Sequence, residues 1–281
     1  MRKLKFYLVF TLSALFLVSG CARGAKVTKF TPLSGPIPKD GVMEMVAAAQ
    51  AKPDYEERFV RKRYVYIMAW NGINVGRIIA EFGDIIEYRG RQVFTVKLVT
   101  ESNKFLSKIF RVEDTFISYV DTETLTSRYF EADRKEGNYR KHLVVEYDFD
   151  SLQAIYSNLK DGSVKRCKIY KDVHDPLSAV CRFMTMPVKL NEKAVLIVNL
   201  NEKNFEVSGR VDDLEVIKLP GLGSFPAFKI RPEAMAEGQT YDKGKGYLYF
   251  SADKDRYPLY GVVQIPFGKV TATLHSIDYV R

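Results

Sequence analysis

From residue 58 onward, apolar and polar positions alternate along most of the chain, and the alternating segments are rich in Tyr, Phe, Val, Ile and Thr. A period of two with these residue types is typical of β-strands that bury one face. Turn-forming residues separate the segments, and Asn71-Gly72 is the clearest hairpin signal. The pattern predicts an antiparallel meander with strands at 64–70, 75–82, 91–100, 115–121, 125–133, 138–148, 155–158 and 164–170.

A helical period replaces the alternation at residues 175–184. Asp175 is suited to cap the amino end of this helix, and Pro176 fits its first position. Four apolar side chains share one face at this spacing: Leu177, Val180, Cys181 and Met184. Residues 40–50 and 103–110 show shorter helical patterns.

After the helix the period of two returns, and strands are predicted at 194–199, 205–211, 214–219, 227–231, 246–252, 259–265 and 269–280. The chain is therefore expected to be mainly β. We expect one strongly curved or partly closed antiparallel sheet or barrel, with one or two short helices packed against it. Residues 247–250 are bulky on both strand faces, which fits either an interior shaped for an apolar ligand or a thick dry core.

The first residues have the order of a secretory signal: a basic start, an uncharged apolar run over residues 6–18, and small residues before Cys21. The apolar run is shorter than the ~20 residues of a membrane-spanning helix. The sequence thus predicts a signal peptide at 1–20, a Pro- and Gly-containing tether at 21–41 and a single β-rich domain at 42–281.

Residues 18–21, Val-Ser-Gly-Cys, resemble the lipobox of bacterial lipoprotein precursors. The resemblance implies that Cys21 is acylated on its sulfur and becomes the first residue of the mature chain; the alternative is an ordinary cleaved signal. No aspartate follows Cys21, which resembles lipoproteins sorted to the outer membrane. We therefore expect a cell-envelope protein, lipid-anchored in the outer membrane and facing the periplasm.

Charge adds little to this picture. Lys and Arg outnumber Asp and Glu by 43 to 34, a net charge of +9, and acidic residues are interspersed throughout. Without a long basic stripe, and in an exported protein, nucleic-acid binding is not expected. The net positive charge allows a weak attraction to anionic lipid headgroups or to cell-wall polymers.

The mature chain keeps two cysteines besides Cys21, at Cys167 and Cys181. An exported protein meets an oxidising environment, so a disulfide between these two is allowed. The alternative is a pair of buried free thiols.

The sequence lacks the usual signatures of catalysis. It contains no Gly-x-Ser-x-Gly motif. Its histidines, His142, His174 and His275, have no second His or Cys at ligand spacing, so neither a metal nor a cofactor is expected. We expect no enzyme activity, although His174, Asp175 and Ser178 gathered in an open cleft would favour a hydrolase.

Three blocks of sequence carry a resemblance to a known family: residues 66–76, residues 175–182 with Asp175-Pro176-Leu177-Ser178-Ala179 and Arg182, and residues 247–274. Together they resemble domain of unknown function 3108, a family of exported bacterial proteins. The resemblance implies a fold similar to that of lipoprotein carriers, in which a curved sheet wraps around helices and encloses an apolar cavity. The family offers no activity to transfer.

The expected role is non-enzymatic binding of a lipid or other amphiphilic envelope component. The candidate ligand-binding residues are Trp70, Arg182, Tyr247 and Tyr249. Trp70 could equally anchor the core at the first hairpin, and Arg182 could form an ion pair. The alternative role is structural, with a sheet face or edge docking another cell-envelope protein.

Overall fold

The computed structural model describes residues 58–236, 239–240 and 246–279. The predicted signal peptide, the tether, the helix at 40–50 and Cys21 therefore lie outside the described residues. The first half of the fold consists of β1 (Lys62–Trp70), β2 (Ile73–Tyr88), β3 (Arg91–Ser102), α4 (Lys104–Ser107), β4 (Glu113–Asp121), β5 (Ser127–Glu136), β6 (Tyr139–Asp148), β7 (Gln153–Asn158) and β8 (Val164–Lys168).

The second half begins at the short strand that precedes the long helix. It consists of β9 (Val173–His174), α5 (Pro176–Thr185), β10 (Lys193–Leu200), β11 (Lys203–Leu219), β12 (Gly223–Ala236), β13 (Gln239–Thr240), β14 (Gly246–Ser251), β15 (Pro258–Ile265) and β16 (Gly268–Tyr279).

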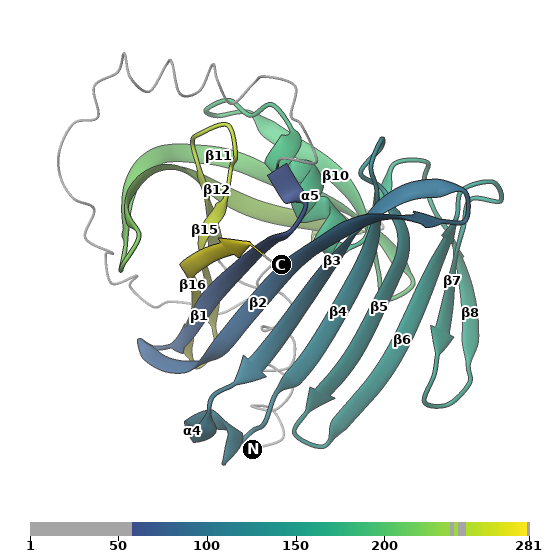
Figure 1. The fold of residues 1–281 in the computed structure, drawn as a ribbon, viewed down its shortest axis with the longest axis horizontal. Helices are drawn as coiled ribbons and strands as arrows, with labels where there is room; N and C mark the ends of the chain where they lie inside the picture. The colour runs from purple at the N-terminus through teal and green to yellow at the C-terminus, as the bar shows by residue number, and fades with distance from the viewer. Residues whose placement is uncertain (1–57, 237–238, 241–245, 280–281) are drawn as a thin grey trace.

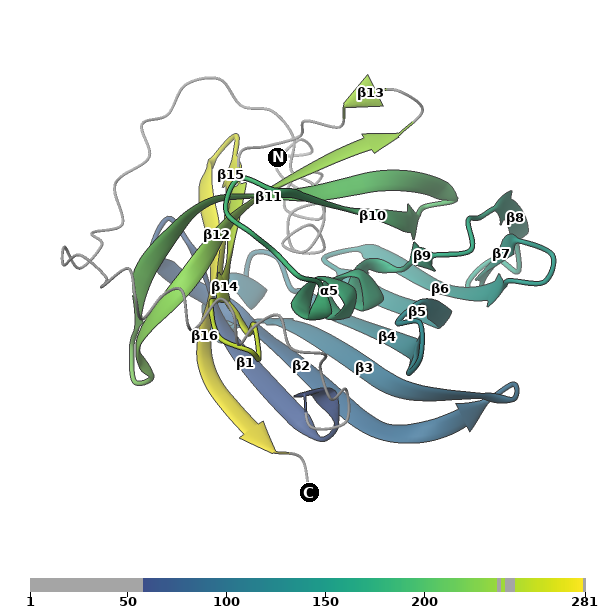
Figure 2. The same ribbon diagram turned by 90° about the horizontal axis from the view of Figure 1, so that it is seen from above.

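All the described strands belong to one sheet. Its order is β8-β7-β6-β5-β4-β3-β2-β1-β16-β15-β14-β12-β11-β10-β9, with β13 paired to β12. Neighbours are antiparallel except β9 and β10. The sheet curls until β10–β12 lie over β3–β6, and α5 fills the space between these two layers (Figures 1 and 2). This arrangement confirms the predicted mainly β fold with a curved, partly open sheet.

The alternation in β1 shows how the sequence builds the core. Tyr64, Tyr66 and Met68 are buried, whereas the residues between them are half-exposed. Because successive side chains of a strand point to opposite faces, these three line the concave side. One hydrophobic cluster joins them to side chains from both ends of the sheet and from α5.

Several element boundaries differ from the prediction. β11 is continuous across Asp212 and Asp213, where a turn was expected, because a register shift between Val211 and Asp213 absorbs the irregularity as a bulge. The helical pattern at 103–110 contracts to the single turn α4. Both two-residue strands, β9 and β13, were missed because they are too short to show a period.

Candidate functional site

The amino end of α5 has the predicted cap. Asp175 Oδ1 accepts hydrogen bonds from the backbone N–H groups of Leu177 at 2.6 Å and Ser178 at 3.0 Å. In return, the Ser178 hydroxyl oxygen accepts from the backbone N–H of Asp175 at 3.0 Å. This reciprocal pair is a capping box, and with Pro176 at the first position it fixes where the helix starts.

The second carboxylate oxygen of Asp175 joins the helix to the sheet. It accepts hydrogen bonds from the hydroxyls of Ser118 on β4 and of Ser127 on β5, the latter at 2.6 Å. All three side chains are fully buried. Burial raises the pKa of Asp175, and the hydrogen bonds from the two serines oppose that shift. A buried carboxylate is tolerable because its oxygens are matched by donors.

His174 and Ser178 lie beside this carboxylate, as a hydrolase would require, but the cluster is closed. The Ser178 Oγ and His174 Nδ1 are 3.4 Å apart, and both residues are buried. Burial, together with the charge of Arg182, lowers the pKa of His174 to about 4, which keeps the ring neutral. The cluster does not open to a cleft, and Asp175 bonds to serines and backbone rather than orienting His174.

The carboxyl end of α5 is held by two buried arginines from distant parts of the chain. Arg58 donates to the carbonyl oxygens of Met184 and Lys254, and Arg256 donates to that of Met186. Burial lowers the pKa of Arg58, and it lowers that of Arg256 to about 10. Guanidinium groups suit this position because helix carbonyls and the negative end of the helix dipole gather there.

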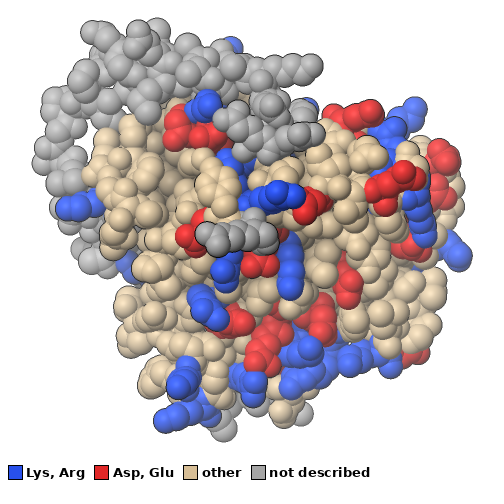
Figure 3. Space-filling model, viewed as in Figure 1, with Lys and Arg blue, Asp and Glu red and all other residues tan. Residues whose placement is uncertain are grey.

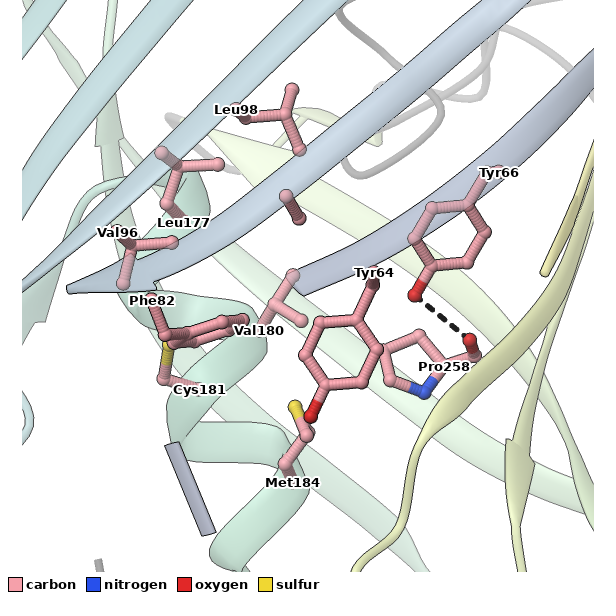
Figure 4. Close-up of a pocket in the computed structure, with 11 residues that line it drawn as sticks. Tyr64, Tyr66, Phe82, Val96, Leu98, Leu177, Val180, Cys181, Met184 and Pro258 are labelled. Carbon is pink, nitrogen blue, oxygen red and sulfur yellow. Dashed lines mark hydrogen bonds between the residues drawn. The ribbon is translucent and has the colours of Figure 1, made fainter. Parts of the chain in front are cut away.

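We call the Asp175 cap with its two serines the amino-terminal clamp of α5, and Arg58 with Arg256 its carboxyl-terminal clamp. Between these two clamps, α5 covers an apolar cavity against strands β1, β2 and β3 (Figure 4). Its lining is almost wholly apolar and comes from Tyr64, Tyr66, Ala80, Phe82, Val96, Leu98, Leu177, Val180, Cys181, Met184 and Pro258. The cavity measures about 30 Å³, enough for about one or two water molecules. Small-molecule sites measure roughly 300–1,000 Å³, so the cavity in this structure is too small to hold such a molecule.

The cavity wall carries two tyrosine hydroxyls, which differ in their hydrogen bonding. The Tyr66 hydroxyl donates to the Pro258 carbonyl oxygen at 2.9 Å (Figure 4). The Tyr64 hydroxyl is buried and has no hydrogen-bond partner among the described residues. Burial raises the pKa of Tyr64, so its hydroxyl stays protonated and keeps a proton to donate. A buried unpaired hydroxyl is costly, which marks it as a functional candidate.

Cys181 contributes its thiol to this cavity, while Cys167 lies on β8 near the open edge of the sheet. Both are free thiols. The side-chain amide of Asn199 donates to the Cys167 sulfur at 3.5 Å. In this structure the two cysteines are therefore free thiols and not a disulfide, because Cys181 packs in the cavity wall and Cys167 lies on β8. Burial raises both pKa values.

The other predicted ligand residues lie away from the cavity. Trp70, at the end of β1, is half-buried against the core, and its Nε1 donates to the Phe267 carbonyl oxygen at 3.2 Å. Arg182 lies on α5 but is not part of the cavity lining, and its charge acts on His174. The structure does not bring these two side chains to one site.

Tyr247 and Tyr249 share a face of β14, and neither lines the cavity. The Lys229 Nζ lies 4.9 Å from the centre of the Tyr247 ring. Tyr249 is the cross-strand partner of Lys229, and it is half-buried against the hydrophobic cluster. The ligand role of both tyrosines stays a prediction.

Sequence reasoning missed Tyr64, although a signal for it existed. The strict alternation of residues 64–68 identifies three side chains on one strand face, of which two are tyrosines. A polar hydroxyl on a buried strand face needs a partner, and that requirement singles out such a residue. The pattern could not show that the Tyr66 hydroxyl finds a partner and the Tyr64 hydroxyl does not.

Within the described ranges, no three His, Cys, Asp or Glu side chains lie together as a metal site would require. No helix in that part of the chain combines the length and the hydropathy needed to span a membrane.

Comparison with solved structures supports the fold. The structure is similar to a beta-barrel-like protein of domain of unknown function DUF1849 from Brucella abortus, with 10% identity, a TM-score of 0.54, and 80% of this chain and 99% of that chain covered. At this identity the likeness shows the fold alone.

Two further solved structures resemble the chain less. They are a candidate lipoprotein from Parabacteroides distasonis (9% identity, TM-score 0.33, 79% and 96% covered) and a candidate exported protein with a YmcC-like fold from Bacteroides fragilis (12% identity, TM-score 0.29, 78% and 95% covered). These likenesses are too slight to carry an argument about function.

No curated protein matches the sequence. The family described as "Protein of unknown function (DUF3108)" matches it over residues 65–275. This range begins within β1, ends within β16 and includes α5 and every residue that lines the cavity except Tyr64, which lies one position before it. The chain therefore belongs to the DUF3108 family.

Proposed function

We propose that this protein is a lipid-anchored protein of the cell envelope that binds the apolar part of an amphiphile between α5 and strands β1–β3. The observation that carries the proposal is the Tyr64 hydroxyl, which is buried in an apolar wall and has no hydrogen-bond partner in the described part of the chain. An amphiphile supplies both things the cavity lacks: apolar atoms for the space and a polar group for the hydroxyl.

Opening has to precede binding, since the cavity of about 30 Å³ is far too small for an acyl chain. Of the elements around it, α5 is the one whose polar contacts are concentrated at its ends, at Asp175 and at the carbonyls bound by Arg58 and Arg256. Displacement of α5 from β1–β3 therefore enlarges the cavity while the sheet stays paired. The energy of opening is set by these two clamps.

The test is native mass spectrometry of freshly purified residues 22–281, a chain that contains every described element, with organic extraction of any excess mass. We expect a bound amphiphile, or uptake of one from an envelope lipid extract. Tyr64→Phe should weaken binding about 2- to 10-fold, because it removes one hydrogen bond and leaves the ring in place. Val180→Phe should weaken it further by filling the cavity.

Tyr170→Phe is the matched control, because it removes the hydroxyl of an exposed tyrosine that does not line the cavity, and it should leave binding unchanged. A clean apo mass with no uptake from the extract would overturn the proposal. Equal losses for Tyr64→Phe and Tyr170→Phe would move the ligand away from the cavity.

The anchor is tested separately. We propose that Cys21 carries the acyl groups and holds the protein in the outer membrane, on its periplasmic side. In the native organism, Cys21→Ser should release the protein from the membrane fraction, and metabolic labelling with a fatty-acid analogue should be lost. Retention of the label in Cys21→Ser would contradict acylation at this residue.

The alternative function, docking on another envelope protein, is supported by the open sheet. In the described part of the chain, β8 pairs only with β7, so its other edge offers backbone groups for an added strand. A photo-crosslinker at Arg166, compared with one at Lys97, which is exposed on the central strand β3, tests this role. A defined protein adduct from β8 only, in a chain that takes up no amphiphile, would favour docking.

A further inference from the structure

Four turns gather at one end of the curled sheet, the lower edge in Figure 1, where α4 is labelled. They come from the β1–β2 hairpin, the segment that contains α4, the β5–β6 hairpin and the β15–β16 hairpin. We call this surface the basic rim and define it as residues 71–74, 103–111, 137–140 and 266–269.

Hydrogen bonds join three of the four turns, namely the β1–β2 hairpin, the β15–β16 hairpin and the segment that contains α4. The backbone N–H of Asn71 in the β1–β2 hairpin donates to the carbonyl oxygen of Lys269 in the β15–β16 hairpin at 2.9 Å. The Asn103 side-chain amide, which precedes α4, donates to the Asn74 carbonyl oxygen at 2.7 Å. The β1–β2 hairpin is thus fixed to a neighbour on each side.

The remaining turn, the β5–β6 hairpin, is attached to the carboxyl end of the segment that contains α4. The backbone N–H of Gly137 donates to the Arg111 carbonyl oxygen at 2.7 Å. A Cβ at Gly137 would lie only 2.7 Å from the Phe110 ring, so the glycine, with a φ of +54°, allows the two segments to approach this closely. The basic rim is therefore one continuous, internally bonded surface.

Large apolar side chains protrude from each of the four turns. They are 40% to 75% exposed and consist of Ile73, Phe105, Ile109, Tyr139 and Phe267. Buried neighbours such as Leu106 and Phe110 hold the same segments to the core. Exposed apolar residues gathered on adjacent turns, and not scattered singly, mark an interaction surface.

The charge of the basic rim is entirely of one sign. Its four segments contain five basic residues, Lys104, Lys108, Arg111, Arg140 and Lys269, and no Asp or Glu. Over the whole chain the ratio is 43 to 34, so this imbalance is local. Figure 3 shows Lys and Arg side chains gathered along the same lower edge. Lys104 and Lys108 are exposed on either side of Phe105.

We propose that the basic rim docks on the surface of an anionic phospholipid bilayer. Phe105, Ile109 and Phe267 enter the interface between headgroups and acyl chains, and the lysines and arginines around them meet the lipid phosphates. Protruding aromatic and aliphatic side chains with a basic surround are the combination that binds such interfaces. The proposal depends neither on the cavity nor on acylation of Cys21.

The sole tryptophan of the chain provides a probe at this position. Trp70 Nε1 donates to the backbone carbonyl oxygen of Phe267, so the indole lies next to the backbone of one of the protruding residues. Docking should shift the Trp70 emission to shorter wavelength, and lipids brominated on their acyl chains should quench it. A protein held only through a distant surface would show neither effect.

The experiment uses unacylated residues 22–281 with vesicles of phosphatidylcholine containing roughly 30% phosphatidylglycerol, and vesicles of phosphatidylcholine alone. Binding is measured by co-sedimentation and by Trp70 fluorescence. We expect binding to the anionic vesicles that falls with salt. The double variant Phe105→Ser/Ile109→Ser should lower the affinity by about tenfold or more, because it removes two of the inserted side chains. Lys104→Glu/Lys108→Glu should do the same.

The matched control is Ile86→Ser/Tyr279→Ser. These exposed apolar residues lie at the opposite ends of β2 and β16 from Ile73 and Phe267, so their loss should leave vesicle binding unchanged. The proposal is overturned if the wild-type chain ignores anionic vesicles, if it binds neutral vesicles equally, or if rim and control variants lose affinity alike. It is also overturned if crosslinks from residue 105 in cells capture a protein and no lipid.

Discussion

Two acidic side chains are buried together near the basic rim, Asp114 on β4 and Glu136 on β5, and each is only 1% exposed. Glu136 Oε1 accepts from the Arg134 Nε at 2.9 Å, and Asp114 Oδ1 accepts from the backbone N–H of Lys135 at 2.8 Å. Burial raises the pKa of Glu136 to about 8, and the neighbouring Asp114 adds to this while Arg134 opposes it. At neutral pH one carboxyl is therefore protonated and can donate to the other.

This pair predicts the sign of the pH dependence of stability. The unfolded chain loses the Glu136 proton near its ordinary pKa of 4.5, whereas the native state keeps it until about pH 8. The native state thus binds more protons across that window, and the contribution of Glu136 to the free energy of unfolding falls as pH rises from 4.5 to 8.

Glu136→Gln should flatten this dependence and raise the free energy of unfolding at pH 8 by on the order of a few kcal/mol. Urea unfolding at a series of pH values measures it. The control is Glu113→Gln, a partly exposed carboxylate two residues from Arg111, which should change the profile little. A profile of Glu136→Gln that parallels the wild type would contradict the assigned pKa.

At the scale of an element, the two ends of α5 are determined by residues at different distances along the chain. Its start is encoded locally by Asp175, Pro176 and Ser178, which form the cap and first turn. Its end is fixed by Arg58 and Arg256, which lie far away in the chain. The helix contacts β4, β9 and β10, so it joins both halves of the curled sheet. Loss of either clamp should therefore loosen the layer between them.

Asp175→Asn tests the amino-terminal clamp, because it replaces the buried carboxylate with an amide of the same shape. An amide keeps the shape and one oxygen, but its NH₂ group cannot accept hydrogen bonds from Ser118 and Ser127. We expect a loss of about 1–3 kcal/mol in the free energy of unfolding. Chemical denaturation measures it, with Asp172→Asn, an exposed aspartate three residues earlier, as control. Equal stability of Asp175→Asn and the wild type would show that the buried carboxylate is not required.

At the scale of the molecule, one hydrophobic cluster extends through the sheet and α5. Strands from residue 62 to residue 279 belong to the same sheet, and its first and last strands, β1 and β16, are neighbours. A long-range pairing of this kind makes the two ends of the fold depend on each other.

We therefore predict one cooperative unfolding transition. Thermal unfolding followed by circular dichroism, which reports all strands, and by Trp70 fluorescence, which reports the β1 end, should give coincident midpoints. Scanning calorimetry should give equal calorimetric and van't Hoff enthalpies. Two separate transitions would show that the chain after α5 forms an independent domain.

The sequence by itself determined most strands, the amino end of α5 and the membership of the DUF3108 family. Strand alternation and the capping box are local patterns: each depends on residues a few positions apart, so a period and a residue type suffice to identify them. The alternation of residues 64–68 was visible for the same reason.

Only the tertiary structure decided which of those faces form the cavity and which turns form the basic rim. Arg58 contacts Met184 and Asn71 contacts Lys269 because the sheet curls and brings distant segments together. The same curvature buries the Tyr64 hydroxyl, which has no hydrogen-bond partner within the described ranges. For this reason Trp70, Tyr247 and Tyr249 attracted attention by residue type, while Tyr64 did not. A period of two shows that a strand has an apolar and a polar face, but the curvature of the whole sheet determines which apolar side chains line the cavity on its concave side.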